Sequence, residues 1–209
     1  MDAIETHHRT TATAAIIGFT AAAAAIGLAD ALNPQWDWVA DLASYYVHGR
    51  GGWLVTAGLA VIGAGSLGLA VLIPPVRGRW ALVGWSLAVL VGAVFPADPP
   101  GHWDRPPTPA GAVHGIAGLT AFVLLPVAAG LLAVGLPAWW PDRRRLRAAA
   151  ALVVAASVPF WVTLVDVMGG PSLTLAGHAS LVGLAERVLL LAGLAWLAML
   201  ALAVRTVPR

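Results

Sequence analysis

Four polar side chains lie in the stretch that joins two strongly apolar runs, FPADPPGHWDRPPTPAGAVHG (residues 95–115): Asp98, His102, Asp104 and His114. Charged groups and imidazoles are costly next to hydrocarbon, so a group of them at one end of two candidate membrane helices is a candidate site. A carboxylate within reach of an imidazole can fix its tautomer and raise its pKa, which makes a general acid or base. We therefore predict that Asp98 and His114 form a catalytic acid/base pair.

Both residues also have ordinary explanations. Asp98 lies between Pro96 and Pro99 and could be a turn residue, and we expect the next helix to begin too far along the chain to be capped by it. His114 could bond to a helix carbonyl instead of a substrate.

Two further charges, Glu186 and Arg187, are adjacent about two turns into the last apolar run. Each would cost roughly 2.5 to 3.5 kcal/mol if it faced lipid, so we expect both to face the interior of the bundle. Neighbouring helical residues point about 100° apart, so at least one must find a partner elsewhere. We predict Glu186 as a second catalytic acid and Arg187 as an anchor for an anion or carboxylate. The alternative is a structural ion pair with another helix.

The segment NPQWDWVADLASYYVHGRGGWL follows the first apolar run. Its aromatic residues are typical of a headgroup boundary, and Asp37, Asp41, Ser44 and His48 recur at helical spacings of three and four. We predict a short interfacial helix that carries all four along one face. Asp41, Ser44 and His48 would then bind substrate, with Ser44 also a candidate nucleophile.

Metal binding has only a weak signal. His48 and His178 come from separate loops and could complete a site with Asp98 or His114, but no close-spaced pair such as HxxxH or HExxH is present. We therefore predict no cofactor, with zinc as the weak alternative.

The elements that must position these residues are membrane helices. The chain has 209 residues, of which 59% are hydrophobic and 11% charged, and it contains no Cys, so disulfides and thiolate sites are excluded. Spans need about 20 apolar residues. We predict one all-α membrane domain over residues 1–209, with six spans at about 13–32, 53–73, 80–96, 109–136, 148–168 and 181–204, and with the interfacial helix between the first two.

The arginines predict the orientation. With six spans both termini share one side, and nine of the twelve Arg residues fall there, against Arg50 and Arg105 opposite. By the positive-inside rule the termini are cytoplasmic. The basic charge therefore reports topology, which argues against a nucleic-acid partner, and the candidate site faces outward from a cell membrane.

These features favour a membrane-embedded enzyme that takes a lipid or other lipophilic molecule, such as a prenyl-type chain, from the outer leaflet. Acid/base chemistry in a site shielded from bulk water suits hydrolysis, isomerisation or cyclisation. We place the cavity between the third, fourth and sixth helices. Trp85, Trp161 and Trp196 could line it and stabilise cations, although helix packing explains them more simply.

A non-catalytic protein is the second hypothesis: a small transporter, a sensor or a partner subunit whose buried charges hold helices together. Transporters often show internal repeats and broken helices at mid-depth. No convincing repeat relates the halves, and the polar residues lie shallow. A haem or quinone protein would need His114 and His178 at matching depth. The oligomeric state is left open.

The motifs SYYVHGRGGWL, FPADPPG with GAVHG, and GLAERVLLLAGLAWLAMLAL resemble those of the bacterial integral-membrane family called domain of unknown function 998. The resemblance covers nearly the whole chain, implies a compact six-helix fold and gives no settled activity. It emphasises these residues: Ser44, Gly49, Gly52, Trp53, Pro96, Asp98, His114, Glu186 and Arg187. On that basis Trp53 joins the substrate-binding candidates. A weaker similarity is to alkaline ceramidase-type membrane hydrolases, but their seventh helix and paired C-terminal histidines are missing.

Overall fold

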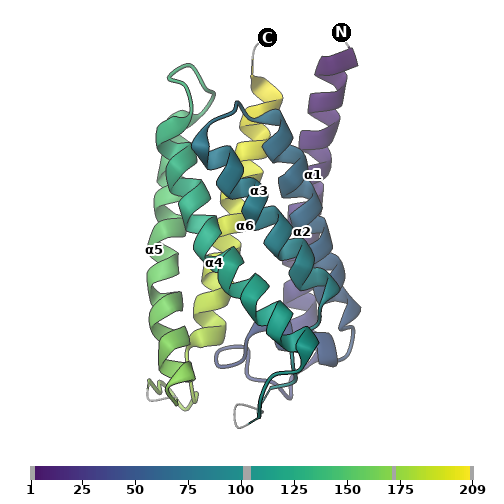
Figure 1. The fold of residues 1–209 in the computed structure, drawn as a ribbon, viewed down its shortest axis with the longest axis vertical. Helices are drawn as coiled ribbons and strands as arrows, with labels where there is room; N and C mark the ends of the chain where they lie inside the picture. Colours follow the sequence, from purple (N-terminus) through teal and green to yellow (C-terminus); the bar gives the residue numbers. More distant parts are fainter. Residues whose placement is uncertain (1–2, 101–104, 171–172, 208–209) are drawn as a thin grey trace.

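The computed structural model describes residues 3–100, 105–170 and 173–207 and is helical throughout, without a β-strand in those ranges. Both ends of the chain lie at the same end of an elongated bundle (Figure 1). The elements, in order, are α1 (Ala3–Leu32), the 3-10 helix η1 (Ala43–His48), α2 (Trp53–Leu72), α3 (Arg77–Val94), α4 (Pro109–Gly135), α5 (Arg143–Met168) and α6 (Val182–Thr206).

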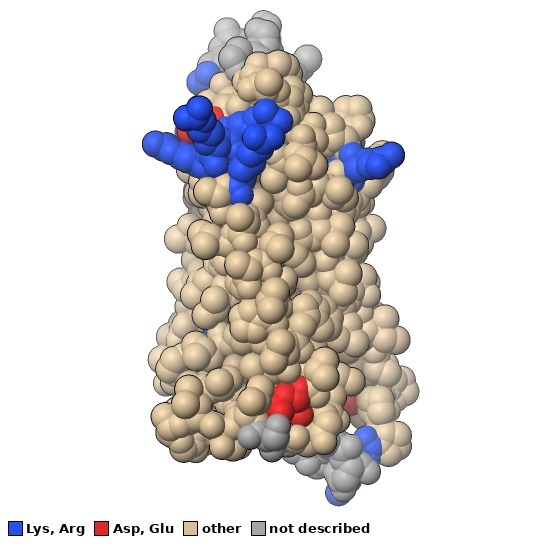
Figure 2. Space-filling view, turned by 90° about the vertical axis from the view of Figure 1, so that its left-hand side faces the viewer, with Lys and Arg blue, Asp and Glu red and all other residues tan. Residues whose placement is uncertain are grey.

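Five helices, α1, α2, α4, α5 and α6, are long and apolar enough to cross a membrane. The remaining long helix, α3, has 18 residues and begins with Arg77 and Arg79. It runs alongside α2 and α4 (Figure 1). The face shown in Figure 2 is almost uncharged between two charged ends, as expected of a surface that meets lipid.

The helix boundaries agree with the predicted spans to within a few residues, with two exceptions. α1 begins at Ala3 and α5 at Arg143, earlier than the apolar runs they contain. An apolar run marks only the part of a helix that meets hydrocarbon. Arg and Ala also have high helix propensity, so they can extend the helix past the end of the apolar run. The polar flanks are therefore continuous with the helices.

α6 is the most enclosed of the five candidate spans. Within an apolar stretch of 18 residues, 56% of the residues of α6 are buried, against 28% to 39% in the other four spans.

The tryptophans predicted to line a cavity lie mostly in the core. Trp196 of α6 and Trp85 of α3 have 1% and 4% of their surface exposed, and Trp161 packs partly buried against the core. Trp53, in contrast, is 70% exposed. Two of the predicted cavity tryptophans are thus core residues.

The expected short helix between the first two spans is present as η1, but it is shorter than predicted. The prediction that it carries Asp37, Asp41, Ser44 and His48 on one face is wrong, because only Ala43–His48 is helical and the preceding residues form turns. The cause is local. Asp37 accepts from the Val39 N–H at 3.0 Å, and the Asp37 N–H donates to the Asp41 carboxylate at 3.0 Å. Such side-chain bonds compete with helical ones.

Candidate functional site

The polar residues gather at the end of the bundle opposite the termini. Arg187, near the start of α6, donates to both oxygens of Asp30 in α1, from Nη2 at 2.6 Å and from Nε at 3.0 Å. Its Nη1 donates to the carbonyls of Asp41 at 2.9 Å and Gly183 at 3.0 Å. The guanidinium also lies 5.3 Å from the centre of the Tyr46 ring. Arg187 therefore ties the first helix, the last helix and the segment between α1 and α2 together.

Glu186 binds the same segment from the next position of α6. Its Oε2 accepts from the Ala43 N–H at 2.6 Å, at the first residue of η1, and its side chain is buried. Gly183 allows this close approach. A Cβ there would meet the backbone of Asp41 and Trp38, so only glycine lets the chain pass over the first turn of α6.

A second pair of hydrogen-bonded side chains closes the cluster. His178 Nδ1 lies 2.6 Å from Oδ2 of Asp37, so the ring donates from Nδ1. Burial alone would raise the pKa of Asp37, but the bonds from His178 and the Val39 N–H lower it below its ordinary value of 3.8. Burial raises the pKa of Asp41, with the charge of Asp37 adding to the effect and the bond from the Asp37 N–H opposing it. The two neighbouring carboxyls thus differ in acidity.

Both tyrosines of η1 face this cluster. Burial, followed by the charges of Glu186 and Asp41, raises the pKa of Tyr45 to about 12. Burial also raises the pKa of Tyr46 to about 12, with Arg187 opposing the shift and Asp30 adding to it. The Tyr46 hydroxyl is buried without a hydrogen-bond partner of good geometry.

A hollow of about 460 Å³ adjoins the ion pair and is lined by Asp30, Ala31, Pro34, Trp36 and Trp38. Trp36 packs edge-on against Tyr46, with ring centres 4.8 Å apart. Trp38 is half exposed. Asp30 therefore belongs both to the buried network and to the wall of an aromatic hollow that opens to the surroundings.

Asp98 supports the start of α4. Its carboxylate accepts from the Thr108 N–H at 3.0 Å and the Thr108 hydroxyl at 2.6 Å. Thr108 is the N-cap residue, and its Oγ1 accepts from the Gly111 N–H at 3.0 Å. As expected, α4 is capped by Thr108 and not by Asp98; Asp98 instead holds the cap residue in place.

His114 and His48 both bond to carbonyls at the end of α3 and in the turn that follows it. Nδ1 of His114 lies 2.8 Å from the Phe95 oxygen and 3.1 Å from that of Gly92. Nε2 of His48 lies 2.6 Å from the oxygen of Ala97. Carbonyls only accept, so these nitrogens carry the protons, and Nε2 of His114 is left as its basic position in the neutral ring.

The other predicted residues occupy separate places. Ser44 lies half-buried within η1. His48 and His178, the weak metal candidates, bond to different partners, and within the described parts of the chain no three His, Asp or Glu side chains are grouped to hold a metal ion. His102 and Asp104 lie outside the described residues. Neither the hollow beside Asp30 nor a second hollow at the opposite end of the bundle is lined by residues of α3 or α4.

Two important residues were missed. Asp30 is a charged residue near the end of an otherwise apolar run. A charge in lipid costs free energy, so Asp30, like Arg187, could have been expected to face the bundle interior and to need a partner of opposite charge there. Asn33 is fully buried, and its amide bonds to Ala29 O at 2.8 Å, Arg50 O at 3.0 Å and the Arg50 N–H at 2.7 Å. Asn33 follows the last residue of α1 and closes the base of the loop that carries η1.

The fold and this cluster define a multi-pass helical membrane protein with a polar network at one end. The chain belongs to the family described as protein of unknown function (DUF998), which matches residues 16–203. Neither a curated protein nor a solved structure matches it. The weaker likeness to ceramidase-type hydrolases is therefore unsupported.

Proposed function

We propose that this protein is a membrane-embedded enzyme that acts by acid/base chemistry on a lipophilic substrate held in the hollow beside Asp30. One observation carries the proposal: Asp30 lines an aromatic hollow while both of its oxygens are fixed by Arg187. A charged group fixed in this way is preorganised, so its geometry does not have to be rebuilt when a substrate binds.

The residues around the hollow have distinct roles in this proposal. Asp30 serves as the base, or as the counter-charge to a cationic centre, and Arg187 orients it. Trp36 and Trp38 hold the apolar part of the substrate and place ring faces near positive charge. Glu186 positions η1 through Ala43 and so shapes the wall of the hollow.

We infer six spans with cytoplasmic termini and an outward-facing site. α3 lies alongside two candidate spans, and its two arginines are at its start, at the same end of the bundle as the termini (Figure 1). Nine arginines of the chain then lie on one side, which the positive-inside rule assigns to the cytoplasm.

The experiment is turnover of lipids extracted from the membranes in which the protein is made, followed by mass spectrometry. We expect Asp30→Asn to abolish the conversion and Trp36→Phe to raise KM with little change in kcat. Asp98→Asn and His114→Ala test the predicted acid/base pair in the same assay. If those two variants alone lose activity while Asp30→Asn retains it, the site lies at the turn between α3 and α4 and the proposal is wrong.

A non-catalytic role is the second candidate, and a specific observation favours it. Asp30, Arg187, Glu186 and Asp98 all make hydrogen bonds that hold helices or loops together. If no lipid is converted and Asp30→Asn lowers only the melting temperature, the cluster is structural.

A further inference from the structure

A second hollow lies at the opposite end of the bundle, where the termini are. It has a volume of about 270 Å³, and its lining is apolar apart from backbone and indole atoms. The end of α2, the turn between α4 and α5, and the end of α6 all contribute to it. The lining residues are Leu72, Ile73, Pro74, Trp139, Trp140, Val204 and Val207.

Hydrogen-bond donors without partners occur at this end. Trp140 is only 4% exposed, and its Nε1 is buried with no acceptor. The Nε atoms of Arg79, at the start of α3, and Arg143, at the start of α5, are also buried without a partner. Arg79 reaches the wall of the hollow directly, because its Nη1 donates to the Ile73 carbonyl at 3.3 Å. These groups can only donate, so a ligand that satisfies them must supply acceptor oxygens.

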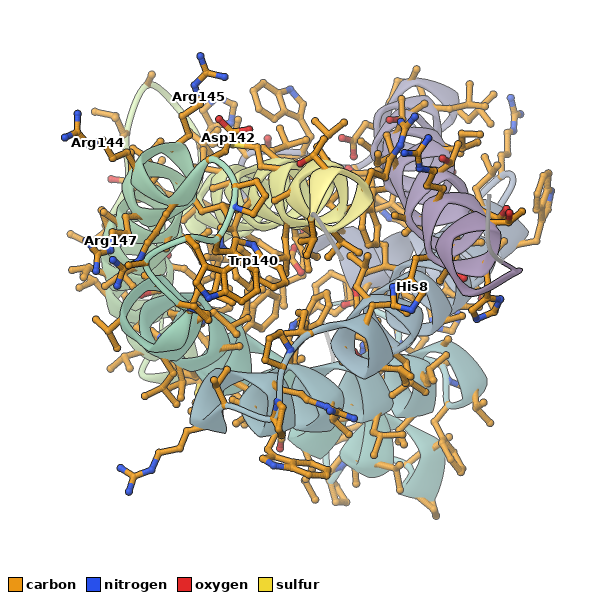
Figure 3. The ribbon with its side chains drawn as sticks, turned by 90° about the horizontal axis from the view of Figure 1, so that it is seen from above. His8, Trp140, Asp142, Arg144, Arg145 and Arg147 are labelled. Atoms are coloured by element: carbon orange, nitrogen blue, oxygen red, sulfur yellow. The ribbon has the colours of Figure 1, made fainter. Side chains whose placement is uncertain are left out.

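Positive charge lies at the same end of the bundle as the hollow. Viewed from above, Trp140 points in among the helices, whereas Arg144 and Arg145 point outward from the start of α5 (Figure 3). Arg147 donates to the Ala133 carbonyl at 2.8 Å. Asp142 lies 3.5 Å from Arg145 and offsets part of this charge. Figure 2 shows basic side chains gathered near this end, above an uncharged flank.

We propose that this hollow binds an anionic phospholipid from the leaflet that the arginines face. An acyl chain fills the apolar part of the hollow, and oxygens of the glycerol ester and phosphate accept from Trp140, Arg79 and Arg143. The exposed arginines attract the negative headgroup, as basic pockets between membrane helices do. The proposal is independent of the site at Asp30, because the two hollows share no residue.

The test is lipid retention by the purified full chain in detergent, measured by native mass spectrometry. Dioleoyl phosphatidylglycerol and dioleoyl phosphatidylcholine are added separately, so that the chains are the same and only the headgroup differs. We expect the anionic lipid to be retained about tenfold more strongly. Trp140→Phe keeps the ring but removes the donor, and should weaken that retention about five- to tenfold. Arg143→Gln should weaken it to a similar degree.

The control variant belongs to the other end of the bundle. Arg50→Gln should leave retention unchanged. Melting without added lipid shows whether each variant is folded; if Trp140→Phe is not, Arg143→Gln carries the test. Equal retention of both lipids overturns the proposal, as does wild-type retention by the folded variants. Full displacement by millimolar inorganic phosphate also overturns it, because the site would then hold a soluble anion.

Discussion

Arg187 and Asp30 are 157 positions apart in the sequence and form a two-bond ion pair between the last helix and the first. The side chain of Arg187 is 7% exposed and that of Asp30 23%. Removing one partner of a buried pair leaves an uncompensated charge and costs about 3 to 5 kcal/mol, whereas replacing both with apolar groups can be neutral. This asymmetry makes the pair testable.

We expect Arg187→Met to lower the free energy of unfolding by about 3 to 5 kcal/mol, because Asp30 is then left without its ion-pair partner. Asp30→Leu alone should cost a similar amount. The double variant should recover much of the loss, which denaturation in mild detergent would measure as a double-mutant cycle. Additive losses in the double variant would show that the two side chains are not energetically coupled.

Gly183→Ala should separate α6 from the loop that carries η1. The added Cβ would meet the backbone of Asp41 and Trp38, which cannot rotate away, so we expect a loss of about 1 to 3 kcal/mol. Gly130→Ala is the matched control, because a Cβ there has nothing within 4 Å. Thermal unfolding of the two variants measures the difference. Equal melting temperatures would contradict the close contact.

Alkaline titration should detect the burial of η1. The chain has two tyrosines, and the pKa of each is about 12 in the folded protein against the ordinary 10.0. We therefore expect phenolate absorbance to rise near pH 12 in the native protein and near pH 10 after denaturation. A group whose folded pKa is raised loses its contribution to stability as pH rises, here between 10 and 12. A native step near pH 10 would place a tyrosine in water.

Thr108→Ala removes the side-chain cap of α4 and also the hydroxyl group that donates a hydrogen bond to Asp98. We expect a loss of about 1 kcal/mol, the usual cost of removing such a cap. Thr108→Ser is the control, since it retains the hydroxyl and should stay close to the wild type. Unfolding curves of both variants give the comparison, and a loss in the serine variant as large as that in the alanine variant would argue against the cap.

The helices could be predicted from the sequence because apolar runs and arginine placement follow from the cost of polar groups in lipid. The same cost argument placed Glu186 and Arg187 inside the bundle. It did not identify Asp30 as the partner, because pairing depends on how α1 and α6 pack. Asp98 and His114 were predicted to form an acid/base pair at the facing ends of one hairpin, whereas their hydrogen bonds to Thr108 and to backbone carbonyls depend on loop geometry. Spacing alone does not determine that geometry.

The pairing of Asp30 with Arg187 has a consequence for how the chain enters the bilayer. A ribosome that adds 5 to 20 residues per second completes the intervening chain in roughly 8 to 30 s, and throughout that time Asp30 has no arginine from α6. Asp30 lies in the last turn of α1, where it can stay at the polar boundary until synthesis ends. The two bonds that fix Asp30 can therefore form only after translation has produced the last helix, so in nascent chains that stop before it this carboxylate should not be held by Arg187.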